Sequence, residues 1–260
     1  MRNHALPSAF CLFAMILLPT FAARSQILLT GTDYTQSFDS LGSGLPLGWS
    51  VYTGANATFL GNSSTFNTAP ASWSATAGAF NNYASADNSG FTGSESSTIQ
   101  AAAPDRALGI RQTGSFGDPG ASFVFELANS TGYSNFQMDL KLEMLSVQGR
   151  SSTWTIDYAT AAVPSLFTVI GTYTDPGSYG TSTFSYNFGN ALDNSNSPVW
   201  IRISALTPST GTGSRDSFAI DDFHLAYTST VPEPCATLLM VVGLGMFGLY
   251  SVIAPSRHKR

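Results

Sequence analysis

The chain has 260 residues, of which 10% are charged and 12% are aromatic, and its formal net charge is −5. Residues 26–230 carry six basic and fifteen acidic side chains, a net charge of −9, which excludes the positive surface that nucleic acid or anionic lipid would need. Low charge combined with many aromatic residues indicates a folded chain rather than a disordered one.

The first 25 residues have the pattern of a secretory signal peptide. Arg2 forms a short basic start, an apolar stretch runs from about Ala5 to Leu18, and small residues follow it. The apolar stretch is too short and too poorly flanked for a stable membrane span, although a retained N-terminal anchor is the alternative. We therefore expect signal peptidase to remove residues 1–25 and the rest of the chain to be exported.

Residues 26–230 are expected to form one exported domain. Their number suits a single β-sandwich better than two smaller domains. Both cysteines, Cys11 and Cys235, lie in the terminal segments, so this domain has no disulfide. Its stability must then come from core packing, with a bound ion as a further source.

Apolar side chains in this domain repeat with a period of two. The clearest stretch is 136–144, where apolar and polar residues alternate over nine positions, as a half-buried strand requires. The same pattern predicts strands over 123–127, 154–158, 184–188 and 199–203. We find no convincing amphipathic helix. The predicted fold is all-β: an antiparallel β-sandwich of jelly-roll type.

The last predicted strand, "DSFAIDDFHLAY" at 216–227, needs a change of phase. Phe218 and Ile220 lie on one face, but the apolar residues at 223–227 share that face only if one extra residue is inserted between the two sets. A β-bulge inserts one residue, and the residues available for it are Asp221 and Asp222. We therefore predict a β-bulge at this pair.

Two adjacent carboxylates at a bulge suggest a structural calcium site. Calcium binds six to eight oxygen atoms from carboxylates and backbone carbonyls. The predicted ligand is Asp221 or Asp222, with a partner from the region of the first strand, Asp33 or Asp39. The alternative is a bulge whose carboxylates are hydrated or cap nearby backbone N–H groups. No other cofactor is expected.

Candidate catalytic groups are few. His224 is the single histidine of the domain; it lies on the outward phase of its strand, and no Gly-x-Ser-x-Gly sequence accompanies it. Paired carboxylates would serve glycoside hydrolysis, but no spacing singles out a pair. We expect a protein that is not an enzyme.

Aromatic residues in a region rich in glycine and asparagine form a candidate sugar-binding platform. They are Trp49, Tyr52, Trp73, Phe80, Tyr83 and Phe91. Sugar rings stack on exposed aromatic faces, but aromatic side chains also supply large buried areas in protein cores. We favour the interpretation that these residues pack the sandwich core.

The C-terminal segment, 231–260, predicts a membrane helix. Residues 235–254 form an uninterrupted run of 20 apolar or small residues, long enough to cross the hydrocarbon core of a bilayer. The basic residues Arg257, Lys259 and Arg260 follow it and are expected to stay in the cytoplasm. The preceding domain would then lie on the outer side of the membrane.

The order of these elements resembles the PEP-CTERM class of exported bacterial proteins. The motif is Val231, Pro232, Glu233 and Pro234, and the span and the basic tail follow it. The resemblance implies a sorting signal that an exosortase-type membrane protease recognises and cuts. The alternative is an ordinary C-terminal anchor that is not cut.

The domain itself is similar, more loosely, to exported bacterial jelly-roll modules. The stretches that carry this similarity are "FDSLGSGLPLGW", "DRALGI" and "SFAIDDFHLAY". The last is similar to the closing strand of many carbohydrate-binding modules. We therefore expect a non-enzymatic surface or extracellular-matrix protein, which passes through the inner membrane before it reaches the cell surface or the matrix. The alternative function is a carbohydrate-binding module with polysaccharide as its partner.

Overall fold

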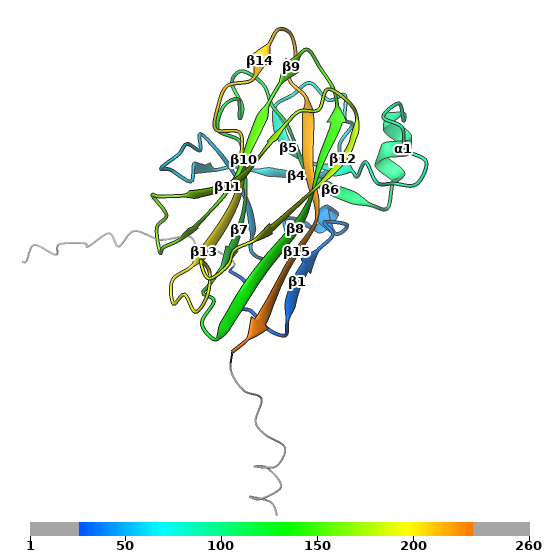
Figure 1. Ribbon diagram of the computed structural model, residues 1–260. Coiled ribbons are helices and arrows are strands. Elements are labelled where there is room, and N and C mark those ends of the chain that lie inside the picture. Colours follow the sequence, from blue (N-terminus) through cyan, green and yellow to red (C-terminus); the bar gives the residue numbers. More distant parts are fainter. Residues whose placement is uncertain (1–25, 231–260) are drawn as a thin grey trace, which may run out of the picture.

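The computed structural model describes residues 26–230, and these residues form two β-sheets packed face to face (Figure 1). The seven-stranded sheet has the order β12 (Gly180–Asn187), β8 (Tyr133–Ser146), β15 (Ser217–Ser229), β6 (Arg106–Arg111), β5 (Ala79–Ala84) and β4 (Phe66–Pro70), with β1 (Asp33–Gln36) also paired to β15. The six-stranded sheet has the order β11 (Thr168–Thr174), β10 (Thr153–Thr160), β13 (Val199–Ser204), β7 (Ser122–Leu127), β2 (Trp49–Thr53) and β3 (Asn62–Ser63). The predicted all-β sandwich is confirmed.

Smaller elements lie around the two sheets. A two-stranded sheet joins β9 (Arg150–Ser151) to β14 (Thr210–Gly211). The short helices η1 (Leu41–Ser43) and α1 (Ser97–Ala102) were not predicted. The strand pairing is antiparallel throughout the two large sheets except between β4 and β5, which are parallel.

The strand predicted over 136–144 forms the middle of β8. Leu140 is 1% exposed and faces the core between the sheets, whereas the side chain of Lys141 on the opposite face is 31% exposed. The predicted register is therefore confirmed. The lysine is less exposed than its position suggests, because its ammonium group lies between two carboxylates.

The predicted β-bulge in the last strand is confirmed. In the pairing of β15 with β8, Asp221 lies opposite Lys141 and His224 lies opposite Asp139, so β15 holds one extra residue. Asp222 adopts a φ of 43°, in the left-handed region that bulges often use. Because of this insertion Phe218 and Phe223 both face the core, where they are 1% exposed.

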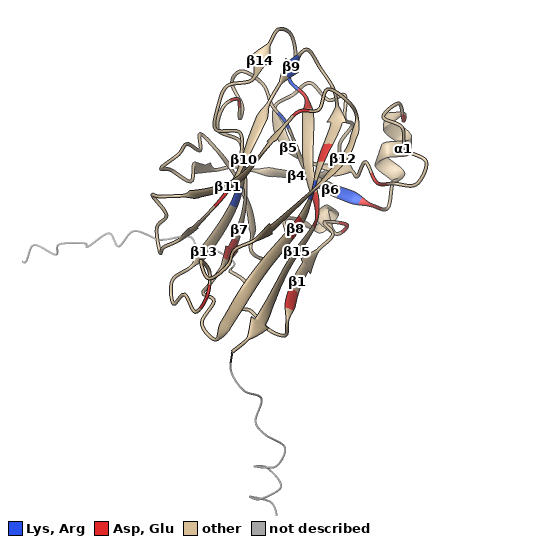
Figure 2. Cartoon of the chain, viewed as in Figure 1, with Lys and Arg blue, Asp and Glu red and all other residues tan. Residues whose placement is uncertain are grey.

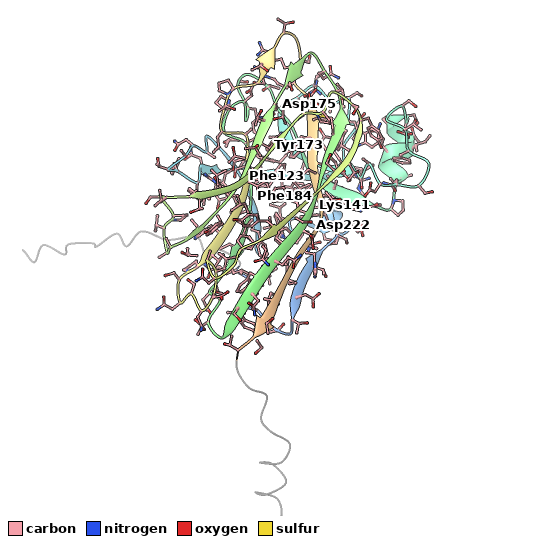
Figure 3. All side chains as sticks on the ribbon, viewed as in Figure 1. Phe123, Lys141, Tyr173, Asp175, Phe184 and Asp222 are labelled. Carbon is pink, nitrogen blue, oxygen red and sulfur yellow. The ribbon has the colours of Figure 1, made fainter. Side chains whose placement is uncertain are left out.

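Apolar packing occurs in three layers. The main core lies between the sheets, and Figure 3 labels Phe123 within it. A second cluster, which includes Trp73, Tyr83 and Leu145, covers the outer face of the seven-stranded sheet. A third, which includes Tyr52, Val124 and Trp200, covers part of the outer face of the six-stranded sheet.

A buried ion pair lies on the outer face of the six-stranded sheet. Arg202 of β13 donates two hydrogen bonds of 2.7 Å to the carboxylate of Asp157 of β10, and their side chains are 0% and 1% exposed. The same guanidinium donates to the carbonyls of Asn56 and Phe59 at 3.0 Å. The ring of Phe167 lies over it, 3.4 Å from the guanidinium carbon. Figure 2 shows how sparse charged residues are on the strands around this pair.

Several predicted features fall outside the described residues. These are the signal peptide, the Val231–Pro234 motif, the membrane span over 235–254 and the basic tail. Within residues 26–230 no helix has the length and apolarity needed to cross a bilayer.

Candidate functional site

A polar groove of about 530 Å³ lies at one end of the seven-stranded sheet. Its walls come from four separate segments: 72–74 before β5, 92–100 leading into α1, 145–147 at the end of β8, and Tyr179 just before β12. Six serine residues and one threonine contribute hydroxyl groups to its lining, and Glu95 is the one charged residue among the described lining residues. We treat this groove as the candidate site.

Side-chain hydrogen bonds hold in place the wall of the groove that residues 92–100 form. Ser96 caps α1 by accepting a hydrogen bond from the backbone N–H of Ile99. The buried amide of Gln100 accepts from the backbone N–H of Trp73 at 2.8 Å and donates to the carbonyl of Glu95 at 2.7 Å. Gln100 therefore ties two walls of the groove together.

Two aromatic side chains, Trp73 and Tyr179, form one wall of the groove. The indole of Trp73 is 2% exposed and donates to the carbonyl of Ala84 at 2.9 Å. Its ring lies 5.3 Å from that of Tyr179, whose hydroxyl donates to the carbonyl of Ala86. The half-buried Tyr179 ring also packs on Gly93, where an added Cβ would come within 2.7 Å of it. The groove is thus shaped by a fixed aromatic wall.

Glu95 supplies a negative charge at the rim. Its carboxylate accepts hydrogen bonds from the backbone N–H groups of Thr92 at 2.6 Å and Gly93 at 2.9 Å. Slight burial raises the pKa of Glu95, but these hydrogen bonds outweigh it and lower the pKa below its usual value. The carboxylate therefore stays ionised at neutral pH and can accept further hydrogen bonds from a bound hydroxyl group.

Of the aromatic residues considered from the sequence, Trp49 and Phe80 pack in the core between the sheets as favoured, whereas the others pack in the two outer clusters. Trp49, Tyr52, Trp73, Phe80 and Tyr83 are each 5% exposed or less, and Phe91 is half-buried against Trp73. They do not form an exposed platform. Trp73 lines the groove, and so does Tyr179, which was missed because it follows a turn and belongs to no alternating pattern.

Asp221 and Asp222, the predicted calcium ligands, have different surroundings. Asp221 is buried, and its Oδ1 accepts from the N–H of Asp222 at 2.8 Å, while its Oδ2 has no hydrogen-bond partner among the described residues. Burial, together with the nearby carboxylate of Glu143, raises the pKa of Asp221 to about 10. Asp222 instead pairs with Lys141 at 2.7 Å, and Lys141 also contacts Asp87 (Figure 3).

The expected partners of these aspartates are also occupied elsewhere. Asp33 lies 3.8 Å from Nε2 of His224, and Asp39 accepts a hydrogen bond from the backbone N–H of Arg106. In the part of the chain that the structure describes, no three acidic, histidine or cysteine side chains are grouped as metal ligands. Calcium binding at Asp221 or Asp222 stays a prediction, which thermal unfolding in calcium and in chelator can test.

His224 lies on the outward face of β15, as predicted. Its side chain is 39% exposed, between Asp33 on β1 and Asp139 on β8. Its Nδ1 is 3.6 Å from the carboxylate of Asp139. This arrangement gives His224 acidic neighbours from two adjacent strands.

Comparisons with known proteins give no family for the chain: no family model matches it, and no curated protein does. Some solved structures are similar in shape. The xylan-binding family 22 module of xylanase 10C from Paenibacillus barcinonensis is 9% identical, with a TM-score of 0.43 over 81% of this chain and 100% of that one. A second structure holds the CBM22-1 and GH10 modules of endo-1,4-beta-D-xylanase 10B from Clostridium thermocellum. It is 8% identical, with a TM-score of 0.43 over 77% of this chain and 29% of that one.

A third similar structure is the K1 cleaved adhesin domain of Lys-gingipain from Porphyromonas gingivalis. It is 10% identical, with a TM-score of 0.40 over 75% of this chain and 98% of that one. All three TM-scores are below 0.5, so these similarities carry no argument about the fold or the function of this chain.

Proposed function

We propose that residues 26–230 form a non-enzymatic carbohydrate-binding module of jelly-roll type, carried by an exported surface or matrix protein. The observation that supports this proposal is the polar groove beside α1, with its many hydroxyl groups, its aromatic wall and its ionised Glu95. Sugars present many hydroxyl groups, which exchange hydrogen bonds with serine hydroxyls and carboxylates, and apolar ring faces, which pack on aromatic side chains.

The groove suits a short segment of a polysaccharide. Binding sites for small molecules are concave and measure about 300–1,000 Å³, a range that includes this groove. Its hydroxyl groups remain close to solvent, so a ligand would replace bound water rather than break buried protein contacts. The expected result is modest affinity and selectivity set by hydroxyl geometry.

Filling the groove tests this function. Ser97 lines the groove at the start of α1 and is exposed, so Ser97→Trp should block the groove without disturbing the core. A glycan array on residues 26–230 should identify a ligand for the unmodified domain, and Ser97→Trp should weaken its binding by roughly tenfold or more, a loss of about 1.4 kcal/mol.

The control for this experiment is Asn196→Trp, at an exposed position outside the groove lining. It should bind like the unmodified domain. Equal binding by all three proteins would place the ligand elsewhere, and no binding to any glycan by the unmodified domain would refute the proposed function.

We also propose that the C-terminal segment directs sorting through an exosortase-type protease, with release to the cell surface or matrix. The support is the order of the Val231–Pro234 motif, the apolar run over 235–254 and the basic tail. Glu233→Ala should leave the full-length protein in the membrane of the native host. If the unmodified protein and the Glu233→Ala variant have the same mass and the same fractionation, the segment is only an anchor.

A further inference from the structure

One corner of the groove presents hydrogen-bond acceptors to a ligand. It consists of Thr92, Gly93, Ser94 and Glu95, in the segment that leads into α1, and we call it the acceptor corner. Thr92 and Ser94 are exposed, and Glu95 is half-buried. An ionised carboxylate only accepts hydrogen bonds, and this fixes which group donates in each contact of the corner.

Four donors of the acceptor corner are used within it. The N–H groups of Thr92 and Gly93 donate to Oε1 and Oε2 of Glu95 at 2.6 and 2.9 Å. The hydroxyl of Thr92 also donates to Oε1, at 3.2 Å. Because that hydroxyl has then used its hydrogen, Ser94 is the donor in the 2.9 Å contact between the Thr92 and Ser94 hydroxyl groups. None of these four hydrogens is left for a ligand.

Two acceptors of the corner remain available. Oε2 of Glu95 accepts one hydrogen bond, from Gly93, and a carboxylate oxygen has room for a second. Ser94 has no donor to its Oγ among the described residues, since its own hydrogen points to Thr92. No basic side chain of residues 26–230 forms an ion pair with Glu95. The corner therefore suits a group that brings a positive charge and more than one N–H donor.

The aromatic wall lies beside this corner. Gly93, whose N–H binds Glu95, packs so closely on the Tyr179 ring that an added Cβ would come within 2.7 Å of it. Burial and, after it, the charge of Glu95 raise the pKa of Tyr179, as expected for neighbouring groups. Aromatic rings and carboxylates both attract an ammonium group. The wall and the carboxylate therefore favour the same kind of ligand.

The charge of the domain acts in the same direction. Residues 26–230 carry a net charge of −9, and no basic residue is present among the described lining residues of the groove. A polysaccharide with carboxylate or sulfate groups would find no cation there and would be repelled by the field of the domain. A polysaccharide with amino groups would be attracted.

We infer that the groove selects polysaccharides with free, protonated amino groups, such as polymers of glucosamine, and that the acceptor corner binds one of these ammonium groups. The ammonium donates to Oε2 of Glu95 and to Oγ of Ser94. A sugar hydroxyl has a single hydrogen and can satisfy only one of these two acceptors. This inference rests on the proposed function, because it names the class of ligand that the same groove takes.

Two oligomers that differ only at nitrogen test this inference. Glucosamine and N-acetylglucosamine oligomers of equal length share one backbone, but acetylation removes the positive charge. At about pH 5.5 a glutamate is ionised and an amino group is protonated. Calorimetric titration of residues 26–230 should show roughly tenfold tighter binding of the glucosamine oligomer. A galacturonate oligomer of the same length, which is anionic, should bind most weakly.

Salt provides a readout that needs no variant. The preference for the glucosamine oligomer should shrink as the salt concentration rises, because ions screen a charge pair near the surface. Binding of the N-acetylglucosamine oligomer, which has no charge, should change little. A preference that does not depend on salt would contradict an ion pair at the acceptor corner.

Three variants separate the charge of Glu95 from its role in holding the segment. Glu95→Gln should weaken binding of the glucosamine oligomer by roughly tenfold and leave that of the acetylated oligomer within about twofold. Glu95→Asp keeps the charge and should keep part of the preference. The control is Asp193→Asn, which removes one negative charge at the opposite end of β8 from the groove, where Asp193 accepts from the N–H of Asn135. It should leave the preference unchanged.

Several results would overturn the inference. These are equal binding of the two oligomers, tighter binding of the acetylated or galacturonate oligomer, and a preference that survives Glu95→Gln. Tighter binding of an oligolysine peptide of equal length would overturn it too, because the groove would then recognise a basic peptide. Equal binding of the two oligomers would leave the proposed function standing, whereas an absence of binding to any glycan would contradict both proposals.

Discussion

Arg202→Ala is expected to destabilise the domain by about 3–5 kcal/mol, because it leaves a buried carboxylate without its partner. Asp157 is 1% exposed and receives both of its ion-pair hydrogen bonds from Arg202. The carbonyls of Asn56 and Phe59 would lose their guanidinium donor as well. Urea unfolding followed by fluorescence measures the change in the free energy of unfolding.

Two further variants test whether the loss of stability comes from the unpaired buried charge. Replacing both partners with apolar residues, Arg202→Met with Asp157→Leu, should cost far less than the single change, since no charge then remains buried. Arg150→Ala should cost about 1 kcal/mol or less, because Arg150 is only half-buried and donates to the carbonyls of Ser209 and Gly213, with no carboxylate left unpaired among the described residues. A loss below 1 kcal/mol for Arg202→Ala would mean that the ion pair is open to water.

Leu140→Ala is expected to cost about 2–5 kcal/mol, since it removes a fully buried side chain from the main core and leaves a cavity. The neighbouring change, Lys141→Ala, should cost about 1 kcal/mol or less. Its ammonium group contacts Asp87 at 2.5 Å and Asp222 at 2.7 Å, but its side chain is 31% exposed and solvent screens both pairs.

The Lys141 contacts revise what the sequence suggests. Alternation alone makes Lys141 an ordinary surface residue whose loss should cost within about 0.5 kcal/mol, whereas its two ion pairs raise the expected cost slightly. Thermal and urea unfolding of both variants check the comparison. Equal costs for Leu140→Ala and Lys141→Ala would contradict the register of β8.

Alternation predicts a strand most clearly where one face of the sheet meets solvent, although it also identified 123–127 and 199–203, which are buried on both faces. The middle of β8 fulfils this condition, and its register could be predicted from residues 136–144. In β5 and β6, whose residues are almost all buried, a second apolar layer covers the outer face. Their sequences, AFNNYA and RALGIR, place asparagine and arginine in buried positions, so the period of two is lost.

The bulge at Asp221 and Asp222 was predictable because a change of phase leaves a visible trace in the sequence of one strand. The groove was not predictable, because its lining comes from four segments that are far apart in the chain. No local pattern in the sequence encodes how these four segments meet.

The position of β15 has a mechanical consequence. This last described strand lies inside its sheet, with β8 along one side and β6 followed by β1 along the other. A load applied at Thr230 acts along the strand axis, so the hydrogen bonds on both sides are stressed together in shear rather than opened one after another. A domain pulled by its C-terminal end therefore resists extension along this strand.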